Sequence, residues 1–211
     1  MRFAIVCDNE ALKGYKKDWG FSCFIEEKNI LFDTGARGKI LMENMKRMKI
    51  DAEKIDVVIL SHNHWDHIGG LSALKNIPIV YVPKSFSNKI RKKCDAIVHE
   101  VSEAERILDG VFTTGEMGTF IKEQSLIVKT SKGNVVLTGC AHPGLDEIVK
   151  KAREFGEIYA VIGGFHAFSD MTSIADIPLI VPCHCSCYKK KMKKFFRERC
   201  IECGAGKIIE I

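Results

Sequence analysis

The stretch from Ile59 to Gly70 decides the fold, and it reads Ile59-Leu60-Ser61-His62-Asn63-His64-Trp65-Asp66-His67-Ile68-Gly69-Gly70. A mainly apolar run from Ile55 to Leu60 leads into it, and a second apolar segment, Leu71 to Leu74, follows the two glycines. This order predicts a buried strand, a tight turn and the start of a helix. Side chains at the end of a rigid strand, with a turn beside them, can converge on one point.

The ligand-type side chains of this stretch predict a metal site. His62 and His64 are two positions apart and can point the same way as the strand ends, whereas Asp66 and His67 approach from beyond the turn. Neutral imidazoles and a carboxylate suit zinc first, with manganese and iron as alternatives. Because four such side chains crowd a single ion, we expect two divalent ions that share a water molecule. A solvated polar turn is the alternative, but three of the seven histidines fall within six positions here.

The spacing His62-x-His64-x-Asp66-His67, followed by two glycines, resembles the signature of the metallo-β-lactamase superfamily. That resemblance implies an α+β protein with a four-layered αββα sandwich, which we expect to form one domain over residues 1–211. Apolar periodicity agrees, because it predicts two groups of strands with helices beside each, as two sheets packed face to face require. The predicted strands are 3–7, 21–26, 29–32, 55–60, 79–82, 97–101, 111–114, 126–130, 134–137, 158–162, 179–181 and 207–211, and the longer predicted helices are 37–48, 85–93, 143–155 and 188–199.

Two later strand ends offer further ligands. Thr138-Gly139-Cys140-Ala141-His142 follows one strand, and Pro182-Cys183-His184-Cys185 follows another. Histidines at such turns suit zinc-type ions, and the resemblance implies that His184 is the last ligand of the set. We therefore expect His62, His64 and His142 to bind one ion, and Asp66, His67 and His184 to bind the other.

Cys140 departs from the pattern of the superfamily, in which many members carry at this place an Asp that bridges the two ions. A thiolate is a competent metal ligand, whereas a buried cysteine that only packs is the commoner fate of this residue type. Both interpretations stay open. If Cys140 is not a ligand, we expect a weak second site.

Two more residues are candidates on the resemblance and on local chemistry. Asp33, in Asp33-Thr34-Gly35, matches a residue below the metal site that would orient a ligand histidine, and the alternative is a turn aspartate that caps the helix from Arg37 to Met48. His166, after Gly163-Gly164-Phe165, is a candidate catalytic acid or base, a metal ligand or a substrate contact.

The turns Gly139-Cys140-x-His142-x-Gly144, Gly163-Gly164-Phe165-His166 and Pro182-Cys183-His184-Cys185 resemble one branch of the superfamily. This is the dihydropterin synthase-like branch, related to 7,8-dihydropterin-6-yl-methyl-4-(β-D-ribofuranosyl)aminobenzene 5'-phosphate synthase. Three functions follow as hypotheses. The first is a metal-dependent hydrolase, with Asp66 and His166 as catalytic residues. The second is a condensing enzyme of that synthase type, and the third is a cysteine-rich metal-binding or redox-sensing protein without turnover.

Composition indicates which kinds of substrate and which cellular compartment to expect. The formal charge of +5 on 211 residues is mildly basic, which suits a small anionic substrate, phosphorylated compounds included, and is too weak to indicate nucleic acid. Nine cysteines after a start that does not resemble a signal peptide predict reduced thiols in a cytoplasmic protein, with no membrane segment. Cys183, Cys185, Cys187, Cys200 and Cys203 are either packing residues or a separate thiolate site. The oligomeric state is not specified by these patterns.

Overall fold

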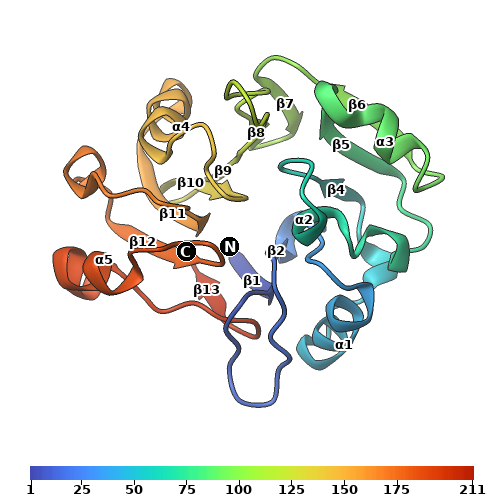
Figure 1. Ribbon diagram of the computed structural model, residues 1–211, viewed down its shortest axis with the longest axis horizontal. Coiled ribbons are helices and arrows are strands. Elements are labelled where there is room, and N and C mark those ends of the chain that lie inside the picture. The colour runs from blue at the N-terminus through green and yellow to red at the C-terminus, as the bar shows by residue number, and fades with distance from the viewer.

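A computed structural model of the chain describes residues 1–211 and shows two β-sheets packed face to face, with helices outside each (Figure 1). The αββα sandwich predicted from the sequence is confirmed. The first sheet has the order β13-β1-β2-β3-β4-β5-β6 and the second β12-β11-β10-β9-β8-β7. The strands of the first sheet are β1 (Arg2–Cys7), β2 (Ser22–Ile25), β3 (Ile30–Phe32), β4 (Val57–Ile59), β5 (Ile79–Pro83), β6 (Ile97–Val101) and β13 (Ile208–Glu210). Those of the second are β7 (Glu105–Leu108), β8 (Val111–Thr113), β9 (Leu126–Thr130), β10 (Gly133–Thr138), β11 (Ile158–Gly164) and β12 (Leu179–Cys183).

The central core lies between the two sheets, and strand alternation builds it. In β1, Phe3 and Ile5 pack against residues of the second sheet, whereas Ala4 and Val6 pack on the other face. Successive side chains of a strand point to opposite faces. Both faces of each sheet are covered, so most of these strands read in the sequence as continuous apolar runs rather than as alternating ones.

Helices cover the outer faces of both sheets. On one side lie α1 (Gly38–Met48), the short α2 (Trp65–Ile68) and α3 (Ser87–Arg91), and on the other lie α4 (Leu145–Ala152) and α5 (Lys189–Phe196) (Figure 1). Leu41 and Met45 of α1 pack in the outer core of the first sheet, and Ile148 of α4 packs in that of the second. None of the helices has the length and apolarity needed to cross a bilayer.

Parallel pairing brings the loops that carry the candidate residues to one edge. β3 pairs parallel with β4, with Phe32 opposite Ile59, so that the residues after these strands lie side by side. In the second sheet β10, β11 and β12 are parallel neighbours, and Gly164 lies opposite Cys183. Because parallel strands end at the same edge of a sheet, the loops after β10, β11 and β12 also adjoin one another.

One strand has no counterpart among the predicted elements. Residues Glu105–Leu108 form β7 at the edge of the second sheet, paired only with β8. All four of its residues are at least partly exposed, so the apolar run by which buried strands are recognised is missing. An edge strand with charged residues is typical of sheets that avoid pairing with other chains.

Candidate metal centre

Six predicted ligands from four separate places in the chain come together where the strands end. His62 and His64 follow β4, Asp66 and His67 lie on α2, His142 follows β10, and His184 follows β12. His62, His64 and His142 each offer a nitrogen, and these lie within 4.8 Å of one another; we name them the imidazole group. Asp66, His67 and His184 meet the same criterion, and we name them the mixed group.

The imidazole group is arranged as the ligands of one ion would be. His62 Nε2 lies 2.9 Å from His64 Nδ1, and the His142 ring stacks edge-on against both rings, at centroid distances of 4.6 and 4.9 Å. His62 is fully buried, whereas His64 and His142 are partly exposed. This group is therefore accessible from one side.

Hydrogen bonds at Nδ1 determine which nitrogens face the centre. Asp33 Oδ2 accepts from His67 Nδ1 at 2.6 Å, Glu123 Oε2 from His142 Nδ1 at 2.9 Å, and Asn9 Oδ1 from His184 Nδ1 at 2.8 Å. A carboxylate or an amide oxygen can only accept, so each of these Nδ1 atoms carries the proton. Each Nε2 then has its lone pair free for a metal ion.

Asp33 is hydrogen-bonded to a predicted ligand, His67, and not to the start of helix α1. Its carboxylate accepts from the Ser61 amide and hydroxyl, both at 2.7 Å, as well as from His67. The Ser61 hydroxyl oxygen in turn accepts from His62 Nδ1 at 2.8 Å. Helix α1 begins after Arg37 and has no side-chain cap. The capping alternative for Asp33 is therefore wrong. Asp33 bonds one predicted ligand, His67, directly and is linked to a second, His62, through the Ser61 hydroxyl.

Glu123 holds the turn that carries His142, although it was not among the residues predicted from the sequence. Its buried carboxylate accepts four backbone N–H bonds, from Gly139, Cys140, Ala141 and His142, at 2.9–3.0 Å. Burial favours the neutral form, but the hydrogen bonds from His142 and the neighbouring His62 hold the pKa of Glu123 well below its usual range. The only signal in the sequence is a short polar run, Glu123 to Ser125, directly before a buried strand.

His184 has its own support, which the sequence analysis also missed. Asp8 Oδ2 accepts from the His184 amide at 2.8 Å, and Asn9 Oδ1 binds the His184 ring and the Gly20 amide. These bonds hold His184 with φ at +43°, a left-handed conformation that costs of order 1–3 kcal/mol for such a residue. Asp33, Ala141 and His166 are left-handed too, so four strained residues gather at this edge.

Burial tunes the charges of the centre. It lowers the pKa of both His62 and His67 to about 3, with neighbouring histidines adding to the effect, so both rings are neutral near pH 7. Burial favours the neutral form of Asp66, but the adjacent His184 and His67 rings outweigh it and hold the pKa of Asp66 well below its usual range. His184 Nε2 lies 3.3 Å from Asp66 Oδ2. Neutral imidazoles beside an ionised carboxylate are the forms that bind a divalent ion.

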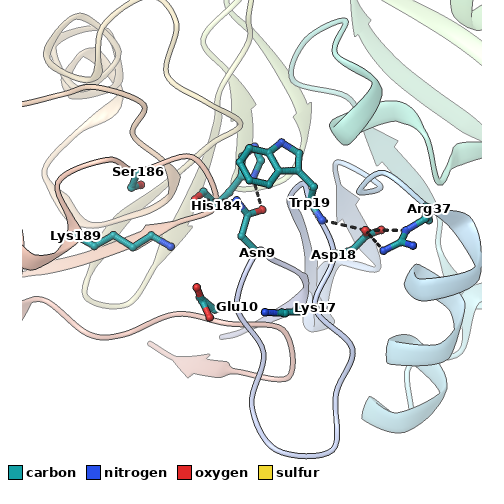
Figure 2. A pocket seen from close by; sticks show the side chains of 9 residues that line it. All are labelled: Asn9, Glu10, Lys17, Asp18, Trp19, Arg37, His184, Ser186 and Lys189. Atoms are coloured by element: carbon teal, nitrogen blue, oxygen red, sulfur yellow. Dashed lines mark hydrogen bonds and ion pairs between the residues drawn. The ribbon is translucent and has the colours of Figure 1, made fainter.

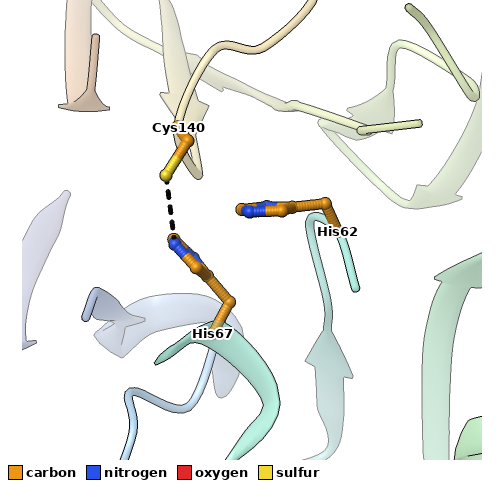
Figure 3. A group of neighbouring side chains, drawn as sticks. All are labelled: His62, His67 and Cys140. Atoms are coloured by element: carbon orange, nitrogen blue, oxygen red, sulfur yellow. Dashed lines mark hydrogen bonds between the residues drawn. The ribbon is translucent and has the colours of Figure 1, made fainter. Parts of the chain in front are cut away.

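The other two candidates lie at different distances from the centre. Cys140 is buried, and its Sγ lies 3.2 Å from His67 Nε2, with His62 close by (Figure 3). His166 is exposed at the rim, its ring 5.2 Å from that of His142, and belongs to none of the donor clusters. The donor set of imidazole nitrogens, one carboxylate and nearby sulfur fits zinc-type ions.

A pocket of about 580 Å³ opens beside His184 (Figure 2). Its lining consists of Asn9, Glu10, Lys17, Asp18, Trp19, Arg37, His184, Ser186 and Lys189. The Arg37 guanidinium is bound to Asp18, but Lys17 and Lys189 form no salt bridge. The Trp19 side chain is largely exposed and meets the His184 ring edge-on at 5.9 Å. An aromatic surface and two free ammonium groups therefore adjoin the mixed group.

Comparisons with known proteins agree with this architecture. The model of the metallo-beta-lactamase superfamily matches residues 21–84, which include the His62–His67 stretch. The 7,8-dihydropterin-6-methyl-4-(beta-D-ribofuranosyl)-aminobenzene-5'-phosphate synthase of Methanocaldococcus jannaschii is 28% identical, and the match covers 87% of this chain and 85% of that protein.

Solved structures extend the similarity to the whole chain. A metal-dependent hydrolase of the beta-lactamase superfamily superposes with a TM-score of 0.87 and 28% identity, over 100% of this chain and 99% of its own. Zinc-bound PqqB from Methylobacterium extorquens superposes with a TM-score of 0.65 over 100% of both chains, at 11% identity. The second likeness shows the fold alone.

Proposed function

This chain belongs to the metallo-β-lactamase superfamily, and on that premise we propose that it is a metal-dependent enzyme that hydrolyses a small anionic substrate. The observation that carries the proposal is the convergence of the imidazole group and the mixed group, six donors in all, beside a pocket with two free lysines. We propose two divalent ions, zinc first, with manganese and iron as alternatives. Bound there, they would supply an activated water molecule and polarise the bond to be cleaved.

The protein residues would divide the work as follows. Asp66 stays ionised, so its carboxylate would hold one ion and orient the attacking water. Lys17 and Lys189 would bind the anionic part of the substrate, and the face of Trp19 would exclude water from it. His166, exposed beside His142, would give a proton to the leaving group.

A second candidate function is a condensation of the synthase type. The observation that favours it is the similarity to the archaeal synthase over most of both chains. A pocket with an aromatic side chain and two ammonium groups also suits a phosphorylated ring compound. In that reaction the same residues would hold a diphosphate leaving group in place of a scissile ester.

The test is a screen of phosphodiesters, lactones and thioesters with protein of measured metal content. We expect hydrolysis that stops on chelation and returns with added zinc or manganese. Asp66→Asn should fold and lose on the order of 100-fold or more in turnover, because a loss of a supporting residue alone costs 10–100-fold. Asp176→Asn removes a surface carboxylate paired with Arg153 and is the matched control.

The outcomes separate the candidates. Unchanged turnover in Asp66→Asn would remove Asp66 from the mechanism. A metal-loaded protein that hydrolyses none of the three ester classes contradicts the hydrolase proposal. Product analysis with a dihydropterin diphosphate and a ribofuranosylaminobenzene phosphate then tests the condensation.

A further inference from the structure

Two thiols from different loops meet at the mixed group. Cys140 follows β10 and is buried, and Cys185 follows β12 and is partly exposed. The sulfurs of both and one nitrogen of His184 lie within 4.8 Å of one another. The turn after β10 and the turn after β12 therefore meet at this cluster.

The backbone is shaped to let Cys185 approach. A Cβ atom on Gly164 would lie 2.8 Å from Cys185 Sγ, 3.2 Å from Cys140 Cα and 2.3 Å from the Gly139 carbonyl oxygen. The sulfur occupies space that any side chain at position 164 would take. Cys185 Sγ also lies 3.9 Å from the Cys140 carbonyl oxygen. The glycine is thus a requirement for placing this thiol beside the centre.

Cys140 lies between the two donor groups. Its sulfur forms one cluster with His62 and His67, as Figure 3 shows, and another with His184 and Cys185. A sulfur in that position can reach an ion in either group. Separations below 4.8 Å between donor atoms are those expected when sulfur and nitrogen ligands surround one ion, because Zn–S distances are about 2.3 Å and Zn–N distances about 2.0 Å.

We propose that Cys185 and Cys140 act together as thiolate ligands of the ion in the mixed group, which makes this half of the centre selective for thiophilic ions such as zinc and cobalt. The inference rests on the metal centre proposed above. Thiolates favour zinc and cobalt over manganese. On binding, each thiol releases its proton to water and the sulfur bonds to the ion, with no change of oxidation state.

The test uses the full chain loaded with cobalt(II), with the bound cobalt measured in parallel. Thiolate ligands give cobalt a charge-transfer absorption in the near ultraviolet that imidazole and carboxylate ligands do not give. We expect this band in the wild type, a loss of roughly half of it in Cys185→Ser and in Cys140→Ser, and nearly complete loss in the double variant. Cys187→Ser, an exposed thiol in the same loop, is the control and should keep the full band.

Gly164→Ala provides a second test that keeps both thiols. The added Cβ would clash with the Gly139 carbonyl oxygen and with the Cys185 sulfur, so both the turn that carries Cys140 and the Cys185 thiol should shift, and we expect the band to fall at least as far as in Cys185→Ser. Two results would overturn the inference and leave the metal centre intact. One is a wild type that binds cobalt at full stoichiometry without showing the band, and the other is a Cys185→Ser variant that keeps the full band. A wild type that binds no cobalt overturns the metal centre itself.

Discussion

The imidazole group and the mixed group share one edge of the sandwich, but their surroundings differ. Two of the three imidazole-group residues are partly exposed, whereas all three residues of the mixed group are buried. The imidazole group offers only imidazole nitrogens, whereas the mixed group contains an ionised carboxylate and has two thiols at its side. Two members of the imidazole group are thus partly exposed themselves, whereas the mixed group is buried and is approached from the pocket beside His184.

Removing an exposed ligand should have the largest effect. His64→Ala deletes one of three nitrogens of the imidazole group, and we expect metal content to fall from about two ions to about one per chain, because a zinc site rarely holds with two protein ligands. Mass-spectrometric metal analysis measures it. His99→Ala, which removes a ring bound to Glu105 outside the centre, is the control. Two ions retained in His64→Ala would show that the ligand assignment is wrong.

Replacing Glu123, the carboxylate that supports the imidazole group, should have the second largest effect. Glu123→Gln places an amide where four backbone N–H groups need acceptors, and we expect the free energy of unfolding of the metal-free protein to fall by about 3 kcal/mol. Urea denaturation measures it. Glu116→Gln, whose carboxylate accepts one amide at the surface, should change stability by less than about 0.5 kcal/mol. Equal effects of the two changes would contradict the role of Glu123.

Asp33 is the carboxylate that supports the mixed group, and its replacement should have the next largest effect. Asp33→Asn weakens the acceptor of His67 Nδ1 and of the Ser61 hydroxyl, and we expect zinc affinity to fall about 10–100-fold for one of the two ions. Competition with a chromophoric chelator measures it. Asp176→Asn is again the control. If both ions keep their affinity, Asp33 is a structural residue only.

The smallest expected effect is a change in the preference for zinc over manganese when Cys140 is replaced. Cys140→Asp restores the carboxylate that many superfamily members carry at this place, and a hard oxygen ligand favours manganese relative to zinc. We expect the ratio of zinc to manganese affinity to fall by about tenfold, while the imidazole group keeps its ion. Parallel titrations with the two metals measure it. An unchanged ratio would mean that Cys140 only packs.

The sequence predicted most of the metal-centre residues that the first sheet carries and fewer of those that the second sheet carries. The His62–His67 ligands are contiguous, so a strand followed by a turn is enough to bring them together. Asp33 was expected there only through the superfamily resemblance, and the structure gives the reason, because β3 and β4 are parallel neighbours. Glu123 and Asp8 could not, because each acts on a turn far away in the chain and neither carries a local pattern that differs from an ordinary loop.

Cys185, a proposed ligand, could not be identified from the sequence either. Its sulfur lies beside Cys140 in space that a side chain on Gly164, opposite Cys183 in the sheet, would enter. Strand register and a missing Cβ are properties of the folded chain, whereas the spacing of cysteines in the sequence is compatible with both packing and ligation. β7 was missed for a simpler reason, since an exposed edge strand has no apolar run.

We propose that one chain holds two divalent ions in two chemically different donor groups. Native mass spectrometry of the wild-type chain after reconstitution with excess zinc and removal of free ion tests it most directly. We expect a dominant species that carries two zinc ions per chain. A chain that carries at most one zinc ion at saturation would contradict it.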